Sequence, residues 1–211
     1  MTPVALGASI GVKHLGLAEY QPTYAAMRAF TSVRAAHTPD EFWLLEHPPI
    51  YTAGLACRAE HLPRDSDIAL ARVDRGGQIT YHGPGQVVLY TLVDLARRGL
   101  NVRQFVGVLE QAVIDTLGEY RIAAARKSGA PGAYVDGAKI AALGLRVRRG
   151  ACYHGVALNV DMDLAPFLAI DPCGYPGLAV TQLRDLGVST SVDEVGARLA
   201  AKLDQLLRLH G

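Results

Sequence analysis

The chain has 211 residues, half of them hydrophobic, and a formal net charge of +1 at pH 7. This length suits a single domain, residues 1–211, with a sizeable core, and the near-neutral charge argues against broad attraction to nucleic acid or membrane. No apolar run reaches the ~18 residues of a transmembrane helix, and the N-terminus lacks the regions of a secretory signal. With three cysteines and no CxxC pair, we expect neither disulfides nor a metal site, and we expect a cytoplasmic location.

The first half of the sequence predicts strands around one helix. A short strand is expected from residue 10 to residue 16, and apolar side chains at helical spacing predict a helix over 20–34. A buried strand over 42–46 ends at a proline pair, since Pro cannot continue a β-ladder. An extended segment follows from residue 50. Two strand-like stretches, LARVD and VVLYTLVDL, then flank a glycine-rich loop over 75–86.

The second half predicts an amphipathic helix over 102–119 and a group of strands over 133–135, 139–148 and 153–160, with a hairpin turn at Asp136-Gly137. A short helix is expected over 163–170. A last helix over 191–209 carries a capping box formed by Ser191 and Glu194. This order predicts an α/β (α+β) fold, a mixed β-sheet flanked by helices, and disfavours a regular Rossmann domain.

The loop RGGQITYHGPGQ, residues 75–86, is the first candidate site. It matches neither a P-loop nor a dinucleotide fingerprint. Its four glycines would let the main chain approach a ligand closely, and Thr80 and His82 would share one face if the segment is extended. The alternative is a tight connection that holds a buried, hydrogen-bonded histidine.

Cys173 and Lys139 are the candidate reactive side chains. Cys173 stands between Pro172 and Gly174 on a predicted turn, whereas Cys152 in a strand better fits an inert buried thiol. Lys139 begins a stretch of small apolar residues, where partial desolvation favours a neutral amine that can act as a base. A solvated hairpin lysine is the alternative. His154 and Asn159, on either side of Gly155, are expected to line a pocket, and a structural histidine in a strand is the alternative.

Five blocks of the sequence resemble the lipoyl(octanoyl) transferases. They are EHPPIYTAG (46–54), RGGQITYHGPGQVVLY (75–90), DGAKIAALGLRVRRG (136–150), YHGVALNVDMDL (153–164) and IDPCGYPGLAVTQL (170–183). The resemblance covers most of the chain from 10 to about 200. It implies the catalytic-domain fold of biotin and lipoate protein ligases. One departure is Gln182, where many members carry serine.

The resemblance implies a nucleophilic Cys173 paired with Lys139, and three acyl-binding stretches. These stretches are Arg75, Gly76, Gly77, Gln78, Ile79, Thr80, Tyr81 and His82; Ala142, Leu143 and Gly144; and Gly155, Val156 and Ala157. It also implies octanoyl or lipoyl transfer from acyl carrier protein to a lysine of the lipoyl domains of 2-oxoacid dehydrogenase complexes and of the glycine cleavage H protein. No cofactor, ATP or metal is expected.

The implied chemistry leads to two further expectations. Main-chain N–H groups around Gly76, Gly77, Gly144 or Gly155 could stabilise the oxyanion. A basic rim would speed encounter with an acidic carrier protein, and it is expected from Arg97, Arg98, Arg146, Arg148 and Arg149. Two other functions stay open: an ATP-dependent lipoate or biotin ligase, and a non-catalytic module that binds an acylated carrier protein.

Overall fold

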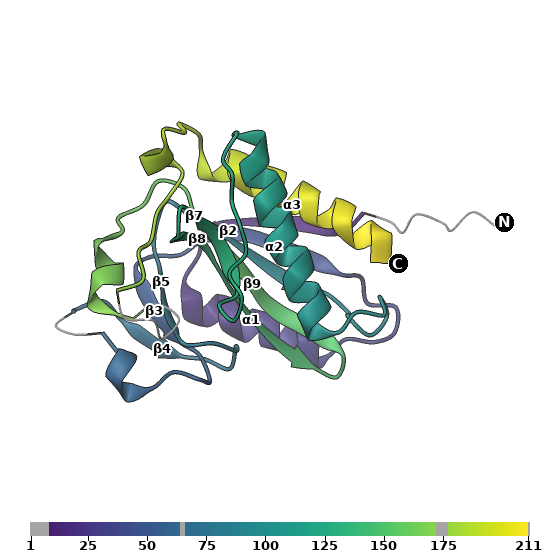
Figure 1. Ribbon diagram of the computed structural model, residues 1–211. Helices are drawn as coiled ribbons and strands as arrows, with labels where there is room; N and C mark the ends of the chain where they lie inside the picture. The colour runs from purple at the N-terminus through teal and green to yellow at the C-terminus, as the bar shows by residue number, and fades with distance from the viewer. Residues whose placement is uncertain (1–8, 64–65, 172–176, 211) are drawn as a thin grey trace.

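The computed structural model describes residues 9–63, 66–171 and 177–210. Within them, the strands form a six-stranded and a three-stranded sheet that lie side by side (Figure 1). The larger sheet has the order β1-β2-β6-β9-β8-β7. Its strands are β1 (Gly11–Leu17), β2 (Glu41–Glu46), β6 (Gln86–Leu92), β7 (Gly132–Val135), β8 (Ala138–Arg148) and β9 (Ala151–Asn159). All neighbouring strands are antiparallel except β1 and β2.

Helices cover both faces of the larger sheet. Helices α2 (Val102–Glu119) and α3 (Val192–Leu207) lie against one face and α1 (Tyr20–Ser32) against the other (Figure 1). The main core lies under α2 and α3 and includes Phe105, Leu109 and Leu199, all fully buried. A smaller core lies between α1 and the sheet, around Met27 and Trp43. The predicted mixed sheet flanked by helices is therefore confirmed.

The two long helices begin at side-chain caps that the sequence encodes. Asn101 and Gln104 form a full capping box at the start of α2. Ser191 caps α3 by accepting a hydrogen bond from the main-chain N–H of Glu194. The predicted box at Ser191 is half formed, because the Glu194 carboxylate instead pairs with Arg198 at 2.9 Å.

The smaller sheet has the order β4-β3-β5, with β4 (Leu70–Arg72), β3 (Ile50–Ala53) and β5 (Ile79–His82). Strand β5 lies inside the predicted glycine-rich loop, so the prediction of a loop throughout 75–86 is wrong for residues 79–82. The sequence hides this strand because glycines bound it closely on both sides. Strand β5 pairs antiparallel with β3, which places Thr80 opposite Thr52 and His82 opposite Ile50.

In the described residues, the remaining helical segments are short 3-10 turns: η1 (Ala59–His61), η2 (Ala165–Ala169), η4 (Arg184–Leu186) and η5 (Arg208–His210). The helix predicted over 163–170 is the 3-10 turn η2. In the described part of the chain, no helix has the length and hydropathy needed to span a bilayer.

Candidate active site

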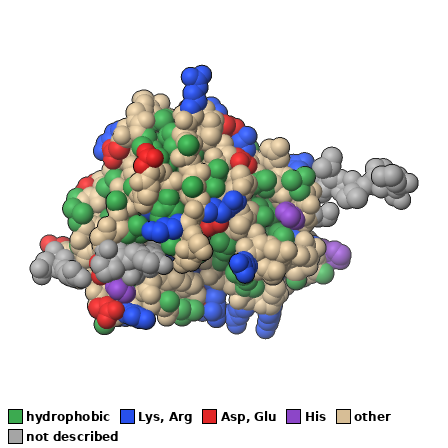
Figure 2. Space-filling view, viewed as in Figure 1, with side chains coloured by type: hydrophobic (Ala, Val, Ile, Leu, Met, Phe, Trp, Pro, Cys, Tyr) green, Lys and Arg blue, Asp and Glu red, His purple; other side chains and the backbone are tan. Residues whose placement is uncertain are grey.

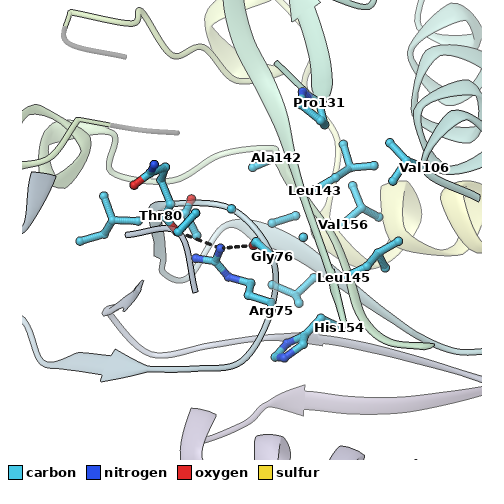
Figure 3. Close-up of a pocket in the computed structure, with 18 of the residues that line it drawn as sticks. Arg75, Gly76, Thr80, Val106, Pro131, Ala142, Leu143, Leu145, His154 and Val156 are labelled. Carbon is cyan, nitrogen blue, oxygen red and sulfur yellow. Dashed lines mark hydrogen bonds between the residues drawn. The ribbon is translucent and has the colours of Figure 1, made fainter. Parts of the chain in front are cut away.

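A cavity of about 400 Å³ lies between the two sheets. This volume falls within the usual range of small-molecule sites, roughly 300–1,000 Å³. Its walls come from β5 and the preceding loop, from β8 and β9, from the start of α2, and from residues 129–131 (Figure 3). It gathers the predicted binding residues Arg75, Gly76, Gly77, Gln78, Ile79, Thr80, His82, Ala142, Leu143, Gly144, Gly155, Val156 and Ala157. Their contact with substrate stays a prediction.

Tyr81 does not line this cavity. Successive side chains of a strand point to opposite faces, so Thr80 and His82 face the cavity while Tyr81 packs on the far side. There its ring lies 5.5 Å from those of Tyr51 and Phe167, centre to centre. Tyr81 is therefore placed to stabilise the smaller sheet.

The Arg75 side chain holds the glycine loop in shape. Its guanidinium donates to the main-chain oxygens of Gly76 at 3.0 Å, Gln78 at 2.9 Å and Thr52 at 2.6 Å. Gly54 leaves room for this arrangement, because a Cβ there would lie 2.8 Å from the Arg75 Nη1 atom. The Gly76 N–H donates to Leu145 O at 2.8 Å. This N–H is therefore not available for an oxyanion, and that expectation is wrong for Gly76.

One wall of the cavity is apolar. Leu143 and Val156 pair across β8 and β9, and Figure 3 shows them beside Leu145 and Val106, on the opposite side from Arg75 and Thr80. Gly155 lies opposite Tyr90 where β9 pairs with β6, and a Cβ there would lie 2.1 Å from Leu89 O. Small residues therefore let the strands pack closely, while branched side chains face the cavity.

A buried group of rings closes part of the cavity: His82, Tyr20 and Tyr90, with His47 behind them. The His47 Nδ1 atom lies 2.6 Å from Ala18 O, so it carries the proton, and Nε2 accepts from the Tyr90 hydroxyl at 2.7 Å. Burial lowers the pKa of His47 to about 4. Burial, with His47 nearby, lowers the pKa of His82 to about 3. Both rings are neutral at pH 7.

These neutral histidines predict a loss of stability in acid. The ordinary pKa of histidine is 6.5, so between pH 6.5 and 4 the unfolded chain binds protons that the folded chain does not. The free energy of unfolding should fall on the order of 1 kcal/mol per pH unit for each buried histidine. His47→Gln should flatten this slope while lowering stability at pH 7. Urea denaturation at a series of pH values measures it, with the exposed His37→Gln as control. An unchanged slope in His47→Gln would contradict this role.

Asp74 anchors a second polar group beside the cavity. It accepts hydrogen bonds from the hydroxyls of Tyr24 (2.8 Å) and Tyr153 and from His154 Nε2 at 3.4 Å. Burial acts to raise the pKa of Asp74, but hydrogen bonds from His154, Tyr153 and Tyr24 outweigh it and hold this pKa well below the ordinary 3.8. His154 lines the cavity with a backbone φ of 63°, a strained value for a non-glycine residue. An ionised Asp74 therefore fixes the strained His154 at the cavity wall.

Lys139 is buried, with 3% of its surface exposed, so the alternative of a solvated hairpin lysine is wrong. Its Nζ atom donates to Pro131 O at 3.1 Å and lies 5.2 Å from the centre of the Tyr134 ring. Gly132 makes room for it, because a Cβ there would lie 3.3 Å from Nζ. Pro131 lines the cavity. The Lys139 amine therefore lies behind the cavity wall, hydrogen-bonded to a residue that forms this wall.

Cys173 lies outside the described residues, so its distance from Lys139 stays a prediction. The segment that follows it is placed: Lys139 N donates to Ala179 O at 2.8 Å, and Thr181 N donates to Lys139 O at 3.0 Å. Gln182, the departure from the family pattern, is buried. It accepts from Met162 N at 2.6 Å and donates to Asp185 at 3.1 Å. The Gln182 side chain thus connects the segment after Cys173 to Met162, just beyond the end of β9.

The other two thiols are unsuited to attack. Cys152 is fully buried in β9, as predicted, and burial raises the pKa of its thiol to about 12. Cys57 is partly exposed, and burial still raises the pKa of its thiol. A nucleophilic thiolate needs the opposite shift.

Sequence comparisons place the chain among known proteins. The family described as the lipoyl protein ligase A/B catalytic domain matches residues 20–204. An octanoyltransferase of Aromatoleum aromaticum is 61% identical over 93% of this chain and 85% of its own length. Another, of Thiobacillus denitrificans, is 59% identical over 94% of this chain and 91% of its own length. The chain belongs to the octanoyltransferases of this family. It is an acyltransferase of protein lipoylation, and the ligase alternative is no better supported.

Solved structures agree on the fold of this octanoyltransferase. Lipoate-protein ligase A bound with ATP superposes with a TM-score of 0.77 at 18% identity, over 95% of this chain and 86% of that one. A biotin protein ligase from Aquifex aeolicus in complex with biotin and ATP gives 0.58 at 15%, over 92% and 70%. The biotin and lipoate ligase fold that the resemblance implied is confirmed.

Among the polar side chains at the octanoyltransferase cavity, sequence reasoning missed Tyr20, Tyr90 and Asp74. Asp74 directly precedes Arg75 and the glycine loop. This position is the one sequence signal that could have marked it as a residue of the site. Tyr20 begins α1 and Tyr90 lies in β6. They come together with His82 only through the packing of α1 on the sheet, which no local pattern encodes.

Proposed function

We propose that this octanoyltransferase works in two steps through Cys173. The Cys173 thiolate attacks the octanoyl thioester on the phosphopantetheine arm of acyl carrier protein, the old C–S bond breaks, and the released sulfur takes a proton from the Lys139 ammonium, which leaves Lys139 neutral. The ε-amine of a lipoyl-domain lysine then attacks the Cys173 thioester. An amide forms, the Cys173 sulfur leaves, and the proton of the amine passes to Lys139. Splitting the transfer in this way lowers each barrier.

The observation that carries this proposal is the position of Lys139. A buried amine behind the wall of an acyl-sized cavity, on the strand that pairs with the segment after Cys173, is suited to hold a thiolate and to accept a proton. Thr80 and Ala142 border both this cavity and a small gap at Lys139. The acyl carbonyl would reach Lys139 at this point, with the alkyl chain along Leu143 and Val156.

The proposed reaction needs neither ATP nor a metal. The enzyme thioester lies at nearly the same energy as the donor thioester, and the product amide is more stable than either. The proposed acceptors are the lipoyl domains of 2-oxoacid dehydrogenase complexes and the glycine cleavage H protein, and the proposed location is the cytoplasm.

The surroundings of Arg146 and Arg148 support a place in the proposed carrier-binding rim more directly than those of Arg97 and Arg98 do. Arg146 and Arg148 are exposed on β8, as expected for alternate residues of a strand. Arg97 and Arg98 instead hold the buried Asp40 at 2.5 and 2.8 Å. These ion pairs stabilise the fold, and a contact of Arg97 or Arg98 with the carrier stays a prediction. On the face of the molecule that Figure 2 draws, basic side chains are spread among apolar and acidic ones.

Transfer without ATP tests the proposed function. Purified protein, octanoyl-carrier protein and an apo lipoyl domain should yield a domain heavier by about 126 Da, the mass of an octanoyl group replacing a proton. Free octanoate with ATP and Mg²⁺ should yield none. Modification only in the second mixture would support the ligase, and tight carrier binding without any modification would support the binding module.

Filling the apolar wall should shorten the acyl chain that the enzyme accepts. Leu143→Phe adds volume beside Val156, so we expect kcat/KM for the octanoyl donor to fall roughly 10- to 100-fold, as for other pocket changes of a few methylenes. The butanoyl donor should lose much less. Leu209→Phe, at a position 75% exposed, is the matched control. Equal losses for both donors would contradict the proposed path of the acyl chain.

A further inference from the structure

A line of buried polar groups runs beneath the cavity, from the glycine loop to the segment after Cys173. It links residues of four strands, β3, β5, β6 and β9. Its members, each 9% exposed or less, are Arg75, Thr52, His82, Gln86, Asn159 and Thr181.

The two amides in this line can be oriented from their partners. The Gln86 nitrogen lies 3.2 Å from Tyr81 O, and the Asn159 nitrogen lies 3.0 Å from Thr181 O. A carbonyl oxygen only accepts, so both nitrogens must point at these carbonyls. The Gln86 nitrogen then also donates to Asn159 Oδ1 at 3.0 Å. Each amide thus has one arrangement that satisfies it.

The same reasoning assigns the tautomer of His82 and the direction of the hydrogen bond from the Thr52 hydroxyl. Gln86 Oε1 can only accept, so His82 Nδ1, 2.8 Å away, carries the proton. The other nitrogen of this neutral ring then accepts from the Thr52 hydroxyl at 3.3 Å. That hydroxyl in turn accepts from Arg75 Nη2 at 2.9 Å. Every donor in the line therefore points the same way, and hydrogen bonds arranged like this strengthen one another.

The line ends on the main chain that holds Lys139. Asn159 binds the following segment twice, because its side chain donates to Thr181 O and its main-chain oxygen accepts from Leu183 N at 3.2 Å. Thr181 N then donates to Lys139 O at 3.0 Å. Thr181 lies eight residues after Cys173 by the numbering, so Asn159 holds the chain shortly after Cys173 in place.

We propose that Gln86 and Asn159 are positioning residues of the transferase, which hold the chain that follows Cys173, at Thr181 and Leu183, against the Lys139 strand and couple its position to the Arg75 loop. This inference rests on the proposed Cys173–Lys139 chemistry. Neither amide needs to touch the substrate. Their effect on catalysis comes from geometry, where a misplacement of about 1 Å can cost roughly a hundredfold in rate.

Isosteric variants test this role. Asn159→Asp and Gln86→Glu keep shape and acceptor oxygens but remove the donors to Thr181 O, Tyr81 O and Asn159. We expect kcat for transfer from octanoyl-carrier protein to fall roughly 10- to 100-fold, with KM for the carrier within about twofold. The pH at which iodoacetamide labels Cys173 at half its maximal rate should move up. Gln111→Glu, which changes a surface amide bound to Asp115 on α2, is the matched control.

The outcomes separate this inference from the proposed function. If wild-type protein forms no octanoyl adduct at Cys173, the proposed function itself fails. If the wild type forms it, and folded Asn159→Asp and Gln86→Glu keep kcat and the labelling profile, only the positioning role is overturned. Rates are taken per folded molecule, from the melting curve of each variant. If Asn159→Asp does not fold, Gln86→Glu decides the question by the same two readouts.

Discussion

Replacing Cys173 by alanine should abolish octanoyl transfer. The variant lacks the sulfur that would carry the acyl group between donor and acceptor, so we expect the transfer rate to fall at least roughly a thousandfold, as when other enzymic nucleophiles are removed. The increase of about 126 Da on the intact enzyme should vanish as well. The measurement is intact-protein mass after mixing with octanoyl-carrier protein, together with the rate of lipoyl-domain modification.

The other thiols provide the controls for this result. Cys57→Ala should transfer at the wild-type rate, because that thiol is partly exposed and burial raises its pKa. Cys152 packs in the main core and donates to Thr91 O at 3.2 Å, so its replacement should affect stability before activity. Full activity in Cys173→Ala would show that the two-step route does not operate.

Replacing Lys139 by methionine should slow both half-reactions. Methionine fills a similar volume among Pro131, Gly132 and Tyr134 but carries no amine, so the fold is kept while the proton acceptor is lost. General acid–base groups typically contribute about 10²–10⁴ in rate, and we expect losses in that range. Stopped-flow acylation of the enzyme and single-turnover transfer to a lipoyl domain measure the two steps separately.

The pH dependence distinguishes a chemical role of Lys139 from a structural one. In Lys139→Met, labelling of Cys173 by iodoacetamide should require higher pH than in the wild type, because the partner that holds the thiolate is gone. Lys139→Arg keeps a charge but not a proton acceptor, so it should form the adduct and then stall before transfer. Labelling that follows the same pH curve in all three proteins would contradict the pairing with Cys173.

The sequence predicts those elements that local patterns encode. The helix over 102–119 has the predicted limits, because its apolar stripe begins at the Asn101 cap and ends at Glu119. The β7–β8 hairpin follows from Asp136 and Gly137, both of which have positive φ. Most of the predicted binding residues also line one cavity, since their three sequence blocks lie on β5 and its loop and on the neighbouring strands β8 and β9.

The sequence could not predict what depends on long-range packing. Strand β5 exists because β3 pairs with it, not because its own flanks favour a strand. The sequence suggests only surface charges at Arg97 and Arg98. Their ion pairs with Asp40 form because the fold brings these distant segments together. The role of Asn159 in the polar line has no signal in its own sequence block, because its partners, Gln86 and Thr181, are far away in sequence. Such contacts are set by topology and have no local signal.

The central claim, a covalent octanoyl group on Cys173, is tested most directly by locating that group. Wild-type protein is mixed with octanoyl-carrier protein, quenched in acid without reductant, digested and sequenced by tandem mass spectrometry. The account predicts an addition of about 126 Da on Cys173 that disappears when an apo lipoyl domain is added before the quench. An adduct confined to Cys57 or Cys152, or transfer that proceeds with no adduct on any cysteine, would contradict it.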